Sequence, residues 1–207
     1  ENFNFIEAAV YIKDSAFTLT NSGTIQSAGG AITIETAPPE VENAPAVPGE
    51  LATIRNSGTI QGDYAILVVD NAPADGSPGA APVLAFNSGT MNGNIQTSDF
   101  IDRMFNSGRV DGFAVLGAEN DIWRNIGEGV VTGFVDGGAG NDDLVGGAFE
   151  DNFYGGFGDD RIFGGGGNDL LVGGLISPEI NTGNDNIRGG AGDDEIRGED
   201  GNDTLMG

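Results

Sequence analysis

Short stretches in which apolar and polar residues alternate run through the first two thirds of the chain. Phe17–Thr20 alternates in this way, a turn follows at Asn21-Ser22-Gly23, Thr24–Gln26 alternates again, and Ala31–Ile34 follows a second glycine-rich turn. Alternation with a period of two is the pattern of half-buried β-strands. The pattern predicts three short strands in each unit, and therefore a triangular coil.

The Asn-Ser-Gly turn recurs along the chain and makes this unit a repeat. Copies begin at Asn21, Asn56, Asn87 and Asn106, with a degraded copy at Asn125. The last two spacings are 19 residues. The longer earlier spacings return to this length once two insertions, at about 37–50 and 71–82, are removed. Stacked coils would bury the apolar positions in one core and align the asparagines into a ladder, with a structural role in the turns.

From Gly137 onward the period changes to nine residues, and the first nonapeptide reads GGAGNDDLV. Each of the seven copies begins with a glycine-rich half and carries an aspartate at the sixth position and an apolar residue at the eighth. The fifth copy is interrupted around 176–182. The copies begin at Gly137, Gly146, Gly155, Gly164, Gly173, Gly189 and Gly198.

This residue pattern suits calcium, a hard cation that prefers six to eight oxygen ligands at about 2.3–2.6 Å. A glycine-rich turn can aim several carbonyl oxygens inward, because glycine accepts the backbone angles that this requires. The sixth-position carboxylate supplies negative charge. A merely solvated acidic face would not couple aspartates to glycines and core residues at a period of nine, so we expect calcium sites.

The nonapeptides resemble the repeats-in-toxin (RTX) family, whose pattern is G-G-x-G-x-D-x-U-x. The resemblance implies a hemolysin-type calcium-binding β-roll, in which each ion lies between turns two repeats apart. The ion takes position-1 and position-3 carbonyls from one turn, position-2 and position-4 carbonyls from another, and aspartates from both. Seven repeats paired in this way give five sites.

The ligand set that this resemblance implies is large. Its carboxylates are Asp142, Asp151, Asp160, Asp169, Asp185, Asp194 and Asp203. Its carbonyls come from Gly137, Ala139, Gly155, Gly156, Phe157, Gly158, Gly164, Gly166, Gly189, Gly190 and Gly192. Phe149 and Glu199 replace glycines in the second and last repeats, and the insertion alters the fifth. We therefore expect the first repeat with the third, and the fourth with the sixth, to form the best sites.

The N-terminal coils resemble right-handed parallel β-helices of bacterial surface and polysaccharide-active proteins. The expected fold is all-β, a β-solenoid in which a right-handed parallel β-helix continues into a calcium-binding parallel β-roll. We expect the β-helix to cover residues 1–136 and the β-roll to cover residues 137–207.

The amino-acid composition excludes several classes of partner and of catalytic site. With 32 acidic and 8 basic residues the formal charge is −24, so nucleic acids and anionic membrane surfaces should repel the chain. The chain has no cysteine and no histidine, which excludes disulfides, thiolate chemistry, Ser-His-Asp triads and the usual zinc ligand sets. No run of 18 apolar residues and no charged, then apolar, leader is present, so we expect no membrane insertion. The chain starts without Met and stops at Met206-Gly207 in mid-pattern, so we expect a segment cut from a longer protein.

The RTX resemblance implies secretion by the type I route of a Gram-negative bacterium, with folding outside the cell when calcium binds. We expect a non-enzymatic structural or adhesive module, with the loops at 37–50 and 71–82 as a contact surface for a glycan or a surface protein. The alternative is a polysaccharide-binding or polysaccharide-modifying β-helix, because mannuronan epimerases combine the same two parts. Its candidate residues are Tyr64, Asp99, Asp102, Arg103, Asp121 and Arg124.

Overall fold

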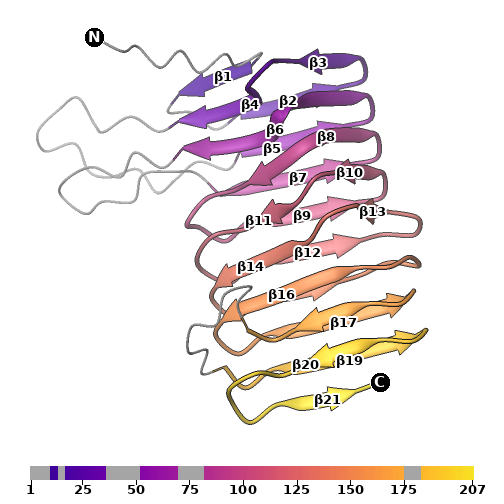
Figure 1. Ribbon diagram of the computed structural model, residues 1–207. Helices are drawn as coiled ribbons and strands as arrows, with labels where there is room; N and C mark the ends of the chain where they lie inside the picture. Colours follow the sequence, from indigo (N-terminus) through magenta and orange to yellow (C-terminus); the bar gives the residue numbers. More distant parts are fainter. Residues whose placement is uncertain (1–9, 14–16, 36–51, 70–81, 175–182) are drawn as a thin grey trace, which may run out of the picture.

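The computed structural model describes residues 10–13, 17–35, 52–69, 82–174 and 183–207. In these residues the chain winds as a solenoid of strands, and all of their strand pairs are parallel. Figure 1 shows the coils stacked from the N-terminal to the C-terminal end. The described residues include no helix, and so none that is long and apolar enough to cross a membrane. The prediction of an all-β parallel solenoid is confirmed.

The chain alternates between two sheets, so each strand lies beside its counterpart in the next coil. One sheet contains, in order, β1 (Val10–Lys13), β4 (Gly30–Glu35), β6 (Thr59–Val69), β8 (Thr90–Gln96), β11 (Ala114–Val115), β14 (Val135–Ala139), β16 (Asn152–Phe157), β18 (Leu170–Val172) and β20 (Glu195–Arg197), with β3 (Thr24–Gln26), β10 (Arg109–Asp111) and β13 (Val130–Val131) beside this path. The other contains β2 (Phe17–Asn21), β5 (Ala52–Asn56), β7 (Val83–Asn87), β9 (Arg103–Asn106), β12 (Ile122–Asn125), β15 (Asp143–Val145), β17 (Arg161–Gly166), β19 (Asn186–Ala191) and β21 (Thr204–Met206).

The predicted triangular coil is present in only some of the turns. Three separate strands occur in the coils β2-β3-β4, β9-β10-β11 and β12-β13-β14. In the coils between them, the second and third strands run together as β6 and β8, which pair with register shifts around Tyr64. An irregularity of this kind bends a strand without ending it, so the corner is a bulge and not a turn. From β15 onward each complete coil holds two nonapeptides and two strands.

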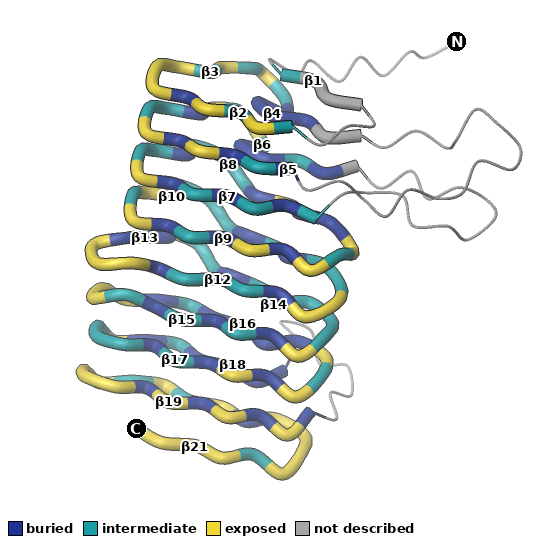
Figure 2. The backbone as a smooth tube through the Cα atoms, turned by 180° about the vertical axis from the view of Figure 1, so that it is seen from behind, coloured by how far each residue is buried: buried dark blue, intermediate teal, exposed yellow. Residues whose placement is uncertain are grey.

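The core follows the predicted alternation. Ile25 pairs with Ile60, Ile60 with Met91 and Met91 with Val110, and the last three of these side chains are buried. In the nonapeptides the eighth-position residues continue two other interior rows, in which Leu144 pairs with Trp123 and Phe153 pairs with Val135. Leu144, Phe153, Ile162, Leu171 and Ile187 are buried, whereas Leu205 in the last strand is 47% exposed. Figure 2 shows this change at the C-terminal end, where no further coil covers the core.

The Asn-Ser-Gly turns form the predicted ladder, here called the asparagine column. The side-chain amide of each asparagine donates to the side-chain oxygen of the next at 2.8–3.0 Å, through Asn21, Asn56, Asn87, Asn106 and Asn125. All five side chains are buried. The column ends on an aspartate, because Asn125 Nδ2 donates to Asp151 Oδ1 at 2.7 Å. Neutral amides that satisfy one another need no counter-ion, so these coils can stack without metal.

Replacing Asn87 by alanine should destabilise the N-terminal coils by about 1–3 kcal/mol, because it removes two buried hydrogen bonds, one from Asn56 Nδ2 and one to Asn106 Oδ1, and each such bond contributes about 0.5–1.5 kcal/mol. Urea unfolding in excess calcium measures the loss. Gln96→Ala, at an exposed position of β8, is the control. Equal effects of the two substitutions would contradict a structural role for the asparagine column.

The two insertions leave the solenoid from neighbouring strands. Glu35 at the end of β4 pairs with Val69 at the end of β6, and Ala52 pairs with Val83 where the chain returns. Both insertions therefore depart from and return to the solenoid side by side at their anchoring strands. The insertions themselves, and the interruption of the fifth nonapeptide, lie almost entirely outside the described residues.

Candidate metal centre

The glycine-rich turns of the nonapeptides stack along two edges of the solenoid. Turns of the odd-numbered repeats lie on what we call the first edge, and turns of the even-numbered repeats on the second edge. Strand pairing sets this arrangement, since β15, β17, β19 and β21 are successive neighbours in one sheet and β16, β18 and β20 in the other. Turns two repeats apart are therefore adjacent in space.

The sixth-position aspartates form a column along each edge. On the first edge the amides of Asp142, Asp160 and Asp185 donate to Oδ1 of the next aspartate at 2.8–2.9 Å, ending at Asp203. On the second edge the column runs through Asp151, Asp169 and Asp194 with bonds of 2.9 and 3.0 Å. The amide of the preceding turn thus fixes one oxygen of each carboxylate after the first.

The second carboxylate oxygen is the notable one. Oδ2 of four of these aspartates is buried and accepts no hydrogen bond; they are Asp142, Asp160, Asp169 and Asp185. A buried carboxylate oxygen without a partner costs several kcal/mol unless a cation compensates it. These unpartnered oxygens show whether the residues present suit a metal ion, and buried carboxylate oxygens of this kind fit a hard cation.

The first glycine of each repeat makes room beside this oxygen. A methyl carbon placed on Gly137 would collide with Asp142 Oδ2 and would lie 2.5 Å from the carbonyl oxygen of Gly155 in the next turn. The same collision with the repeat's own aspartate occurs at the first glycines of the other six repeats. Glycine at this position leaves this pair of oxygens, from two successive turns, open to a ligand.

The carbonyl oxygens of each nonapeptide turn face one of two directions, toward the preceding turn or toward the following turn. Methyl carbons placed on Gly156 and Gly158 would collide with the carbonyl oxygens of Gly138 and Gly140 in the preceding turn. Gly140 N donates to Phe157 O at 2.7 Å. Position-2 and position-4 carbonyls therefore face the following turn, and position-1 and position-3 carbonyls face the preceding one. A carbonyl that accepts one amide bond keeps a second lone pair for a cation.

This direction points to candidate carbonyls that the predicted ligand set did not include. Between the first and third repeats the facing carbonyls are those of Gly138, Gly140, Gly155 and Phe157, and only the last two were in the predicted set. The predicted Gly137 and Ala139 occupy positions whose carbonyls face the turn before the first repeat. No sequence signal distinguishes the two directions, because both sets of residues are glycines or small residues of the same turn.

Burial and mutual repulsion raise the pKa values of the column. Burial, together with repulsion from the carboxylates of Asp142 and Asp185, raises the pKa of Asp160 to about 8 despite the hydrogen bond from the Asp142 amide. Burial likewise raises the pKa of Asp142 and of Asp151 to about 6, and raises the pKa values of Asp169 and Asp185. A divalent cation would favour the ionised form and oppose this shift.

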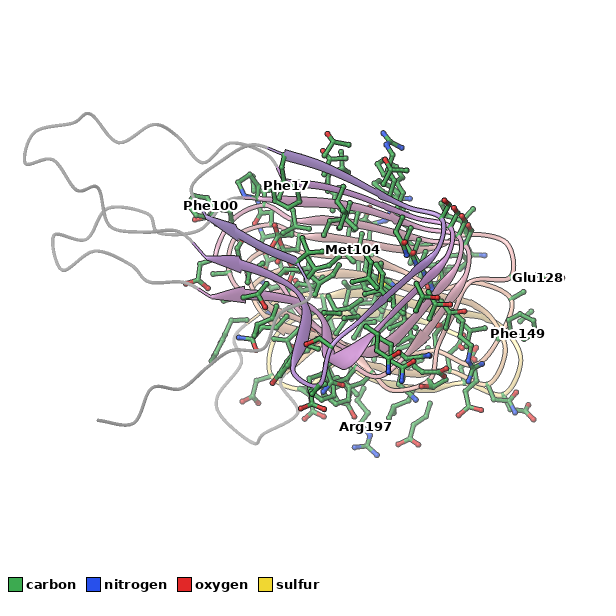
Figure 3. All side chains as sticks on the ribbon, turned by 90° about the horizontal axis from the view of Figure 1, so that it is seen from above. Phe17, Phe100, Met104, Glu128, Phe149 and Arg197 are labelled. Atoms are coloured by element: carbon green, nitrogen blue, oxygen red, sulfur yellow. The ribbon has the colours of Figure 1, made fainter. Side chains whose placement is uncertain are left out.

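Asp151 differs from the rest of its column. Its Oδ1 accepts from Asn125 and its Oδ2 accepts the amide of Gly147 at 2.8 Å, so neutral donors satisfy both oxygens. Phe149, at the fourth position of this turn, is 47% exposed and projects from the rim on the same side as Glu128 (Figure 3). The altered turn thus has the least need of a cation, in line with the expectation of a weak site there.

The residues proposed for polysaccharide chemistry do not gather into one site. Asp102 and Asp121 are buried at turn corners, Arg124 pairs with Asp143, and Tyr64 lies on β6 in the other sheet. In the described part of the chain, no three His, Cys, Asp or Glu side chains come together as a metal-binding group. Each inter-turn site therefore offers two carboxylates, and carbonyl oxygens must complete it.

Comparison with known proteins agrees with this arrangement. Residues 136–171 and 180–207 match the family model of the RTX calcium-binding nonapeptide repeat, in four copies. No curated protein and no solved structure matches the chain. The stacked turns and their buried aspartates are those of a calcium-binding structural module, and residues 136–171 and 180–207 are RTX calcium-binding nonapeptide repeats.

Proposed function

We propose that this chain is a calcium-gated structural module of a secreted protein. The observation that carries the proposal is the row of buried Oδ2 atoms without partners in the aspartate columns. In the proposal, residues 137–207 form a roll that folds when calcium enters between its turns, and residues 1–136 form a β-helix that stacks without metal.

Each proposed site uses the carboxylates of two successive turns on one edge. The turn that comes first in the chain adds its position-2 and position-4 carbonyls, and the turn that follows it adds its position-1 and position-3 carbonyls. Together with one oxygen from each of the two carboxylates this gives six oxygens, within the range that calcium prefers. The first edge then holds three ions and the second edge two. The site between the second and fourth repeats is the weakest, because Asp151 is already satisfied by neutral donors.

The charge distribution supports folding outside the cell. RTX repeats typically occur in secreted proteins of Gram-negative bacteria, and a chain with a net charge of −24 resists compaction where calcium is scarce. Calcium binds the folded state and not the dispersed chain, so its binding free energy becomes folding free energy. The module then stays unfolded during type I export and folds on arrival.

The solenoid geometry supports a structural or adhesive role and no catalysis of its own. The roll continues the two sheets of the β-helix, covering the strand edges and the core at that end. The paired departure points of the insertions at 37–50 and 71–82 favour a shared contact surface for a glycan or a surface protein.

Calcium titration by calorimetry tests the proposal. Asp160 lies between two proposed sites and Asp203 borders one, so Asp160→Asn should lower the number of bound ions by two and Asp203→Asn by one. Both variants remove one charge, which makes each the control for the other. Absence of calcium binding by the unaltered protein, or equal ion numbers in all three proteins, would refute the proposed site.

A further inference from the structure

The aspartate column on the first edge does not end at the first nonapeptide. The amide of Asp121 donates to Asp142 Oδ1 at 2.8 Å, and the amide of Asp102 donates to Asp121 Oδ1 at 2.7 Å. These bonds repeat the contact that joins Asp142 to Asp160. The column therefore continues two coils into the β-helix, beyond the residues that match the RTX repeat.

The segment 116–124 occupies the place of a nonapeptide in this column. It reads LGAENDIWR, and its last three residues pair in register with the last three of GGAGNDDLV, Trp123 with Leu144 among them. Asn120 Oδ1 accepts the amide of Asn141 at 2.7 Å, as Asn141 Oδ1 accepts that of Asp159. The structure thus aligns a turn that lacks two of the family's glycines.

The backbone of this turn has the geometry of the repeats. Gly117, at position 2, has φ of 109°, close to the 99° of Gly138. Glu119, at position 4, has φ of 71°, on the left-handed side where Gly140 has 142°. A glutamate is strained at such an angle, and strain of this kind persists only where the surroundings impose it. The stack imposes the turn even without the glycine.

The oxygens of this turn face the first nonapeptide. Methyl carbons placed on Gly138 and Gly140 would collide with the carbonyl oxygens of Gly117 and Glu119, as in the nonapeptide turns below. Asp121 is 1% exposed, and its Oδ2 accepts no hydrogen bond. The Asp121 carboxylate therefore has one buried oxygen without a partner, as the four repeat aspartates do.

The space between this turn and the preceding one, which contains Asp102, is different. Asp102 accepts the amides of Val83 at 2.5 Å and Ser98 at 2.8 Å and the hydroxyl of Ser98 at 3.0 and 3.2 Å. Thr97 Oγ1 donates to the carbonyl of Leu116 at 2.7 Å. Neutral donors thus satisfy the carboxylate of Asp102, as they do that of Asp151 on the second edge. The need for a cation begins at Asp121.

We propose that Asp121 and Asp142 bind one further calcium ion, between the last turn of the β-helix and the first nonapeptide. The carbonyls of Gly117 and Glu119 supply positions 2 and 4, and those of Gly137 and Ala139 supply positions 1 and 3. This junction site rests on the proposed calcium binding by the repeats. It ties the β-helix to the roll, so calcium-dependent order begins a coil before the RTX repeats.

Three variants of the whole protein test the junction site. Asp121→Asn removes the proposed ligand, Asp203→Asn removes a ligand at the far end of the same column, and Asp99→Asn removes an exposed charge near the junction. Calorimetric titration with calcium should give one ion fewer than the unaltered protein for each of the first two variants and the same number for the third.

Terbium, which occupies calcium sites and emits when a nearby tryptophan is excited, then locates the lost ion. Trp123 is the single tryptophan of the chain and lies two residues from Asp121. Asp121→Asn should therefore lower tryptophan-sensitised terbium emission by a larger share than Asp203→Asn. An unchanged ion number in Asp121→Asn, while Asp203→Asn loses one, overturns the junction site and leaves the repeat sites standing.

Folding of the variant is also informative. Asparagine keeps the oxygen that accepts the Asp102 amide, so Asp121→Asn should retain its β signal in circular dichroism with calcium present. Loss of that signal would show that Asp121 is a structural group and would overturn the inference. Absence of calcium binding by the unaltered protein would instead refute the proposed function itself.

Discussion

Removal of calcium by a chelator at neutral pH should unfold residues 137–207, together with the adjoining coil that contains Asp121, and leave the earlier coils of the asparagine column folded. Residues 137–207 include 15 acidic and three basic residues, and their aspartate columns bring carboxylates of successive turns together in buried positions. Without a cation these charges repel one another at low effective dielectric. The asparagine column has no such charge to compensate, so its coils keep their contacts.

Circular dichroism and limited proteolysis together measure this partial unfolding. The β signal should fall by part of its amplitude, and new cleavage sites should appear in the residues that unfold. Re-addition of calcium should restore both. Magnesium at the same concentration is the control, because it demands a smaller octahedral site and gives up its water reluctantly. A β signal and a cleavage pattern that stay unchanged in chelator would contradict metal-dependent folding.

The repeats themselves could be predicted from sequence because they are strictly periodic. The interior row through Ile60 and Met91, the asparagine column and the sixth-position aspartates each recur at a fixed interval, and a stacked solenoid converts equal intervals into contacts. Periodicity says which residues are equivalent. The expectation that turns two repeats apart stack came from the resemblance to the RTX repeats.

The features that sequence reasoning missed depend on three-dimensional direction. Whether the carbonyl of Gly138 or that of Gly137 faces the third repeat follows from the backbone angles, and both residues read as glycine. The merging of two strands into β6 depends on a bulge near Tyr64, where Gly62-Asp63 by sequence would favour a turn that ends the strand. From the sequence, Asp121 is assigned to the candidates for polysaccharide chemistry, because Leu116 and Glu119 replace the two glycines that would mark its turn as a nonapeptide. The in-register pairing of residues 122–124 with residues 143–145 of the first nonapeptide reveals this additional repeat.

In chelator the protein should regain β structure as the pH falls from about 8 to about 5. Burial, with repulsion from neighbouring carboxylates, raises the pKa of Asp121 to about 9 and that of Asp160 to about 8, and burial raises the pKa of Asp142 to about 6, all from 3.8. Because these folded-state values exceed the unfolded ones, the folded state binds more protons across the interval. The free energy of unfolding then decreases as the pH rises, by about 1.4 kcal/mol per pH unit for each such proton.

The dependence should reverse in calcium, because the ion requires ionised carboxylates and protons compete with it. Circular dichroism across this pH range, in chelator and in excess calcium, therefore should give two curves of opposite slope. Asp160→Asn should flatten the chelator curve, since it removes a carboxyl whose pKa is raised to about 8, while the exposed Asp99→Asn should leave its slope unchanged. A β signal in chelator that rises with pH would mean that the buried carboxylates are already compensated within the chain, and calcium would then have no charge to neutralise.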